Sequence, residues 1–163
     1  EKQDFQRELE TVKSELATAK DKSHFKFTRF HEKQLEVLIL LFNDITDVEI
    51  AIINCNVTEI NKNSSNELNN VIASAYKKQT KLELDIRRNQ IFIDKEVDER
   101  VRQFQSSVIN HLDYLLKVST RLTKINSTEL EKLNLERRHN YKKLIAQVGP
   151  ISSALVKRAK DLL

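Results

Sequence analysis

The sequence predicts an all-α protein: an antiparallel helical bundle with a long N-terminal coiled-coil helix that protrudes from it. Two features of the composition favour this class, a single glycine and a single proline among 163 residues, and a charged content of 32%. A sheet protein needs more Gly and Pro turns to reverse its strands than Gly149 and Pro150 can supply. The third observation is the spacing of hydrophobic residues, which recur every three or four positions, the period of a helix that buries one face.

Residues 1–23 are expected to form a coiled-coil arm, and residues 24–163 the bundle. The hydrophobic residues of the arm step by four, three, four and three positions between polar side chains, which is typical of a coiled-coil seam. They are Phe5, Leu9, Val12, Leu16 and Ala19. Continuing this phase predicts one helix from about residue 3 to 53, about 75 Å long at 1.5 Å per residue. We expect its first half to project and to pair with another copy; the alternative is an arm that frays.

The segment 25–53 contains the densest run of hydrophobic residues and is expected to be the central helix of the bundle. Hydrophobic residues recur at helical spacing along one face of this segment and form a stripe. Further hydrophobic side chains lie outside that stripe, which predicts burial on most sides. Spanning a membrane is excluded, because acidic residues such as Asp44 and Asp47 interrupt every window of about 20 residues.

Three more helices are predicted after a polar connection at residues 54–66. Asn66 is expected to cap the first of them, which ends in a break at residues 89–93. Asp94 is expected to cap the next, which runs to about residue 123. Asn126 and Glu129 have the spacing of a capping box that starts the last helix, and Pro150 should kink or restart it near Gly149.

The stretch 30–37 reads FHEKQLEV, and it resembles the phrase F-x-x-L/F-H-E-K-x-x-E-V-I-x-x-L-Y, which marks a group of uncharacterised bacterial helical proteins. Three further features resemble those of that group: the repeated Glu-Leu pairs of the arm, the FIDKE sequence at 92–96 and the ending after Pro150. Members often carry an N-terminal transmembrane helix before the coiled coil. The resemblance therefore implies a membrane-tethered helical module whose soluble part is this chain, and it implies no activity. The chain departs from the phrase at Leu41-Phe42, where a Tyr is usual.

The residues that common catalytic and metal sites require are mostly missing. One glycine cannot build a phosphate-binding loop, and Cys55 is the only cysteine, which excludes a cysteine-cluster metal site. His31 and Glu32 begin a zinc-protease motif, but Leu35 stands where its second His belongs. Glu136 and His139 match half of a di-iron motif, which chance explains in a chain rich in Glu. We therefore expect no catalytic, cofactor-binding or metal-binding residues, and a protein that is not an enzyme.

The net charge of +4 arises in the last segment, since residues 127–163 carry eight basic and four acidic side chains. This excess makes contact with an anionic partner geometrically possible. The candidate residues are Arg137, Arg138, Lys142, Lys143, Lys157 and Arg158. A solvated helix face interleaved with Glu131 and Glu136 explains the same pattern, and Tyr141 is the only aromatic residue there for stacking on a base.

These observations favour a non-enzymatic interaction or scaffold module that forms homo-oligomers through its arm. The alternative function is binding to nucleic acid or an anionic surface through the basic segment, with nucleic acid the less favoured partner. The lone Cys55 fits a reducing compartment, which predicts a cytoplasmic location. The resemblance also implies that the protein is held at the inner face of a membrane by a segment that precedes Glu1. The identity of any other protein partner does not follow from the sequence.

Overall fold

The computed structural model describes residues 2–21, 29–56 and 60–162. The side chains of residues 2, 4, 5 and 19–21 are outside the described part. The elements in chain order are α1 (Lys2–Asp21), α2 (Arg29–Asn56), α3 (Ser65–Asn89), the 3-10 helix η1 (Gln90–Phe92), α4 (Lys95–Arg121), α5 (Ser127–Ile145) and α6 (Val148–Asp161). These ranges contain helices and no strand, so the predicted all-α class is confirmed.

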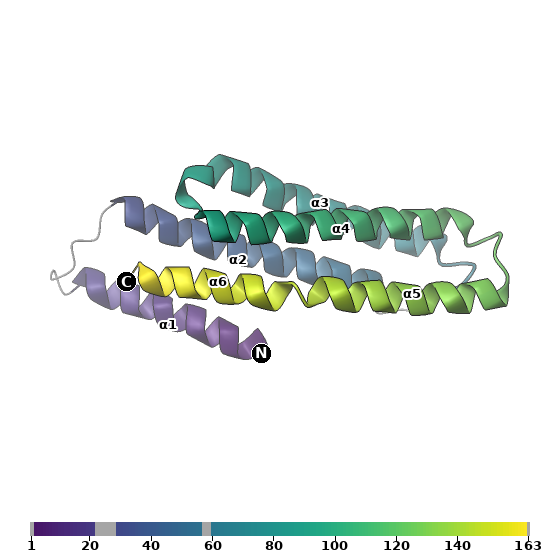
Figure 1. Cartoon of the computed structure of the whole chain (residues 1–163), viewed down its shortest axis with the longest axis horizontal. Coiled ribbons are helices and arrows are strands. Elements are labelled where there is room, and N and C mark those ends of the chain that lie inside the picture. Colours follow the sequence, from purple (N-terminus) through teal and green to yellow (C-terminus); the bar gives the residue numbers. More distant parts are fainter. Residues whose placement is uncertain (1, 22–28, 57–59, 163) are drawn as a thin grey trace.

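The helices lie roughly along one long axis of the molecule (Figure 1). α2 packs against α3, η1, α5 and α6, and α4 packs against α3, α5 and α6. α5 and α6 follow one another along the same side of the molecule, and together they run alongside α4 and extend past its ends (Figure 1). The core therefore lies between α2, α3 and α4 on one side and the pair α5 and α6 on the other.

The prediction that the segment 25–53 is the centre of the core is confirmed for its described residues. Leu41, Val48 and Ile52 are fully buried, and α2 contributes more buried side chains than any other helix of the described part. Residues at these three- and four-residue steps lie on one side of a helix, and neighbours off the stripe, such as Phe42, are buried as well. α2 is hydrophobic on most sides because it has packed neighbours on most sides.

Two predicted caps are confirmed, and one is wrong. The Asp94 carboxylate accepts a hydrogen bond of 2.9 Å from the Val97 amide at the start of α4. The Asn126 side chain likewise accepts from the Glu129 amide at 2.9 Å at the start of α5. Helix α3, however, begins at Ser65 with Ser64 before it, so Asn66 is inside the helix rather than at its cap.

The predicted break at residues 89–93 and the restart near Gly149 are both found. η1 occupies residues 90–92, and α6 begins at Val148 after α5 ends at Ile145. Pro150 lies in the first turn of α6, where its missing N–H removes no hydrogen bond of the helix. The chain is thus interrupted before the proline, at Ala146 and Gln147.

Helix α1 does not project from the bundle as the sequence predicted. It lies alongside α6, below it in Figure 1, and α6 is its main neighbour. Leu9 is 5% and Val12 is 1% exposed, and both belong to the hydrophobic core cluster. The expectation that the first half of the predicted helix projects from the domain is therefore not confirmed. The physical reason is that the stripe of α1 removes its apolar surface from water most readily on the nearest hydrophobic face, which belongs to its own chain. The continuity of the predicted helix through residues 22–28 lies outside the described residues.

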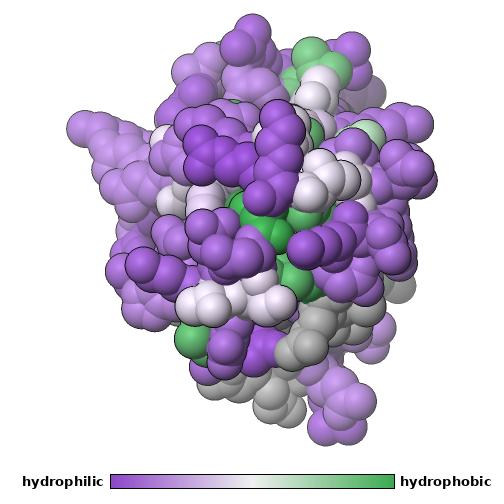
Figure 2. Space-filling view, turned by 90° about the vertical axis from the view of Figure 1, so that its right-hand side faces the viewer, coloured by the Kyte–Doolittle hydropathy of each residue, from purple (hydrophilic) through white to green (hydrophobic). Residues whose placement is uncertain are grey.

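The outer surface is strongly hydrophilic at the end of the molecule where the α4–α5 connection lies. Figure 2 shows that end, with a small hydrophobic area at its centre surrounded by hydrophilic side chains. Among the helices in the described ranges, none is long and apolar enough to cross a membrane.

Candidate functional site

The contact between α1 and α6 is the feature that most resembles a docking surface. On α1, Leu9 and Val12 are buried and Leu16 packs against the core cluster while staying partly exposed. The polar side chains described between them, from Arg7 to Glu15, are exposed. α1 is therefore an amphipathic helix that is attached to the bundle by a narrow stripe.

The α6 side of this contact is built by a helix with two buried faces. One face consists of Ile151, Leu155 and Ala159, which belong to the core cluster. Val156 is also buried, at 5% exposure, and lies one turn before Lys160. The Lys160 ammonium lies 3.9 Å from the Glu8 carboxylate of α1. Residues four apart share a helix face, so Val156 lies on the same side of α6 as Lys160. Val156 is not part of the core cluster that contains Leu9 and Val12.

The structure accounts for three of the five side chains that were predicted to form an oligomer interface. Leu9, Val12 and Leu16 share one face of α1, as their spacing predicts, and this face is turned toward the chain's own bundle. The side chains of Phe5 and Ala19 are outside the described part. Burial decreases along the stripe from Val12 to Leu16. In Figure 1 the C-terminal end of α1 reaches past the end of α6.

The six basic residues that were predicted to contact an anion do not form one surface. Arg137 is only 2% exposed and lies in the core. Arg158 forms an ion pair of 3.3 Å with Asp94, at the start of α4. Arg138, Lys142, Lys143 and Lys157 are exposed and are divided between α5 and α6. No observation therefore favours the anionic partner over a solvated helix face.

Arg137 ties α5 to the end of α2. Its guanidinium donates one hydrogen bond of 3.1 Å to the Cys55 carbonyl and another of 3.1 Å to the Asn134 side chain. Asn134 in turn binds both backbone groups of Ile60, accepting from the amide at 3.3 Å and donating to the carbonyl at 3.2 Å. Arg137 therefore has a structural role. It lies four residues after Leu133 and four before Tyr141, so it shares the face of α5 that packs against the core.

His111 and Cys55 lie near this arginine, but their protonation states do not suit nucleophilic catalysis. Burial, together with the Arg137 charge, lowers the pKa of His111 to about 4. Its Nε2 lies 3.3 Å from the Asn56 amide nitrogen, which fits a neutral imidazole accepting a hydrogen bond. Burial raises the pKa of Cys55 to about 11, so the thiol is protonated at neutral pH and is a weak nucleophile.

A second buried polar cluster links α2 to α3. Asp44 is 2% exposed, and the Lys81 ammonium lies 2.5 Å from its carboxylate and 2.6 Å from that of Asp85. Burial is the main cause that raises the pKa of Asp44 to about 6, and a hydrogen bond with Asp85 adds to it. Asp44 occupies a stripe position between Leu41 and Val48, and the sequence offered no sign that a lysine of α3 would reach it.

The Asp44 carboxyl should make stability depend on pH between about 4 and 6. Its pKa is about 6 in the folded chain against 3.8 for an unperturbed aspartate, so the folded state binds more protons in this range. The stability due to this group therefore falls as the pH rises from about 4 to 6 and stays constant above. We expect the free energy of unfolding of the unaltered chain to fall by up to about 3 kcal/mol relative to that of Asp44→Asn over that range.

Urea titrations at a series of pH values would measure this difference. Asp47→Asn, an exposed position on the same helix, controls for the loss of one negative charge. A difference between the unaltered chain and Asp44→Asn that does not change with pH would show that Asp44 does not titrate in this range.

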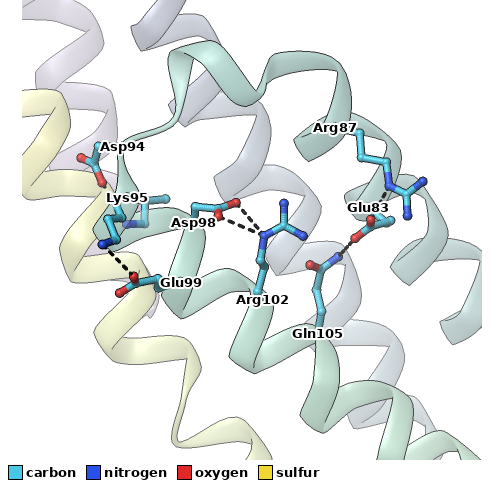
Figure 3. Close-up of polar contacts among 9 residues, drawn as sticks. Glu83, Arg87, Asp94, Lys95, Asp98, Glu99, Arg102 and Gln105 are labelled. Carbon is cyan, nitrogen blue, oxygen red and sulfur yellow. Dashed lines mark hydrogen bonds and ion pairs between the residues drawn. The ribbon is translucent and has the colours of Figure 1, made fainter.

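Charged side chains along α3 and α4 pair with their neighbours without forming a site. Figure 3 shows Glu83 of α3 between Arg87 on its own helix, at 2.5 Å, and the buried Gln105 of α4, which donates to it at 3.0 Å. Asp98 and Arg102 pair one turn apart along α4 at 3.0 Å. Each acid here has a basic or amide partner, which leaves no group of carboxylates free to bind a cation.

Two cavities beside the core each contain one of the residues just described, His111 in one and Cys55 in the other. The larger is an open cleft of about 380 Å³ between α4 and α5, where amides and hydroxyls accompany His111 and Lys143. Across the described ranges, no group of three or more His, Cys, Asp or Glu side chains is placed to hold a metal ion. Glu136 and His139 are exposed on α5.

The contact between Glu8 and Lys160 could not be foreseen, because spacing identifies a buried face without naming the surface that covers it. The buried positions of Arg137 and Asp44, in contrast, could have been found by reading every residue at the stripe spacing, whatever its polarity. No family model matches the chain, and searches of curated proteins and of solved structures found no match either.

Proposed function

We propose that the chain is a non-enzymatic interaction module, an antiparallel helical bundle that self-associates through the hydrophobic stripe of α1. The observation that carries the proposal is the way in which α1 is attached. A helix of 20 residues with a hydrophilic exterior contacts the bundle mainly through α6, by a stripe with the four- and three-residue steps of a coiled coil.

The burial along α1 supports this role in a second way. Leu9 and Val12 are covered by the bundle, whereas Leu16 is only partly buried and the end of α1 extends past α6. Apolar surface that stays exposed on an amphipathic helix commonly marks an interface.

Attachment to a membrane at the cytoplasmic face, through a segment before Glu1, stays a prediction from the resemblance. Binding of an anionic surface by the exposed lysines of α5 and α6 also stays a prediction. The division of the six basic residues among core, ion pair and surface gives it no added support.

Val12→Asp tests the proposed self-association in the full chain. The substitution places a carboxylate at a position that is 1% exposed, so the stripe should no longer dock on any hydrophobic surface. We expect sedimentation velocity to show a loss of the oligomer, and circular dichroism to show that the helices of the bundle remain. Ser14→Asp, an exposed position on the same helix with the same charge change, should leave the oligomer unaffected. If both variants associate as the unaltered chain does, the interface is elsewhere.

A further inference from the structure

We propose that the cleft between α4 and α5 binds a small organic carboxylate, held by the ring of His111 and the ammonium group of Lys143. The proposed site is a different surface from α1, and it stands independently of the self-association proposed above. The cleft has a volume of about 380 Å³. This value is at the small end of the range for ligand pockets, about 300–1,000 Å³, so the cleft suits a small molecule.

Both walls of the cleft carry a row of polar side chains. On each side three lining residues follow one another at steps of three and four positions, which places them on one side of their helix. The Gln147 amide donates a hydrogen bond of 2.9 Å to the Ser107 hydroxyl, which joins the two rows. The rows are Ser107, Asn110 and Tyr114 along α4, and Asn140, Lys143 and Gln147 along α5 and the turn after it.

The ring of His111, which also lines the cleft, has one nitrogen without a hydrogen-bond partner. The Asn56 side-chain nitrogen lies 3.3 Å from Nε2 and donates to the Ile52 carbonyl at 2.7 Å, which identifies this nitrogen as the donor. Nε2 is therefore the acceptor, and the single proton of the neutral imidazole is on Nδ1. Nδ1 is buried and has no hydrogen-bond partner among the described residues.

This buried donor determines what kind of group the cleft should accept. A donor that has left water without gaining an acceptor makes the folded state less stable. Because His111 forms part of the cleft wall, an oxygen of a ligand in the cleft can approach the ring and supply the acceptor. The ring is neutral, so the charge of an anionic ligand must be met by another group.

Lys143 supplies that charge. Among the described residues it is the one charged side chain that lines the cleft, and no acid lines it. Beyond the wall, Glu136 acts on the Tyr114 hydroxyl, while the charge of Arg137 acts on both Tyr114 and His111. The charge of Glu136 is thus balanced by that of Arg137, which leaves the positive charge of Lys143 in excess. A carboxylate matches this excess, and its two oxygens can accept from Nδ1 and from the ammonium.

The rest of the ligand is expected to be short and hydrophobic. Leu144 also lines the cleft and is 3% exposed, so it offers an apolar contact beside Lys143. A phosphate is less suited, because it carries up to two negative charges and is usually bound by several cations. The described part of the cleft wall contains one.

Titration of the full chain, labelled with nitrogen-15, with sodium butyrate at neutral pH and constant ionic strength tests the proposal. Backbone amide signals show where the ligand binds, and long-range nitrogen–proton spectra show which nitrogen of each His ring is protonated. Butyramide has the same shape without the charge and is the ligand control. His139 is exposed on α5 and does not line the cleft, so its ring is an internal reference.

We expect butyrate to shift the Nδ1 signal of His111 saturably, to leave the ring of His139 unchanged, and to act where butyramide does not. Lys143→Gln should raise the dissociation constant about three- to tenfold, because it removes the charge that meets the carboxylate. Lys142→Gln makes the same charge change at the preceding residue, which is exposed and does not line the cleft. It should change the dissociation constant by less than about twofold.

Three results would overturn the proposal. Shifts that never saturate, or that are equal for butyrate and butyramide, would show that the cleft holds water alone. Equal weakening by Lys142→Gln and Lys143→Gln would show that butyrate associates with the lysines of α5 in general. Tighter binding of the peptide acetyl-Gly-Asp-Gly-amide than of butyrate would show that the cleft receives a side chain of a protein partner instead of a small molecule. None of these results changes the oligomer, which sedimentation measures separately.

Discussion

Leu41→Asp is expected to unfold the chain. Leu41 is 0% exposed at the centre of α2, so the new carboxylate would be buried among hydrophobic side chains or force the helices apart. Truncating a buried leucine to alanine alone lowers the free energy of unfolding by about 2–5 kcal/mol, and an unpaired buried charge lowers it further. The sum is comparable to the whole stability of a domain, about 5–15 kcal/mol.

The measurement is a thermal melt followed by circular dichroism, with Ile50→Asp as the matched control. Ile50 lies on the same helix but is 44% exposed, so the same new charge should remain in water and change the free energy of unfolding little. A Leu41→Asp variant that melts as cooperatively and at the same temperature as the unaltered chain would show that α2 is not the central helix.

Arg137→Ala is expected to lower the free energy of unfolding by about 3 kcal/mol. The substitution removes the donors to the Cys55 carbonyl and to Asn134, leaving buried acceptors without them, and it opens a cavity where the side chain was. Because Asn134 also holds Ile60, we expect the connection between α2 and α3 to loosen with it.

Arg138→Ala is the matched control, since it removes the same charge from the next residue of α5 at an exposed position. Exposed substitutions usually change stability by less than about 0.5 kcal/mol. Urea titrations of the two variants measure the difference. Equal stability of the two would mean that Arg137 does not support the core, and it would reopen the interpretation of Arg137 as an anion contact.

Much of the helical framework was predictable because it depends on local rules. The three- and four-residue spacing identified α2 as the core helix, and the caps at Asp94 and Asn126 follow from side chains that accept from amides three residues ahead. The break at η1 was signalled by β-branched and aromatic residues. Asn66 was misassigned because several consecutive residues at that helix start, Ser64 and Ser65 among them, are equally good caps.

The parts that could not be predicted depend on which surfaces meet. The stripe of α1 predicted a buried face, but a spacing rule does not distinguish the chain's own α6 from a second copy. The sequence therefore predicted a projecting helix, whereas α1 lies along α6. The partners of Arg137 and Asp44 show the same difficulty, although the buried positions themselves follow from the stripe spacing. These partners lie far along the chain, the Cys55 carbonyl for Arg137 and Lys81 for Asp44.

The central claim is that the α1 stripe joins copies of this chain, and the most direct test is the mass of the unaltered protein in solution. Light scattering coupled to gel filtration should give at least twice the chain mass of 19.1 kDa at high concentration, and the mass should fall toward 19.1 kDa on dilution. A mass of 19.1 kDa up to the solubility limit would contradict the claim and would leave α1 as a permanent part of a monomeric bundle.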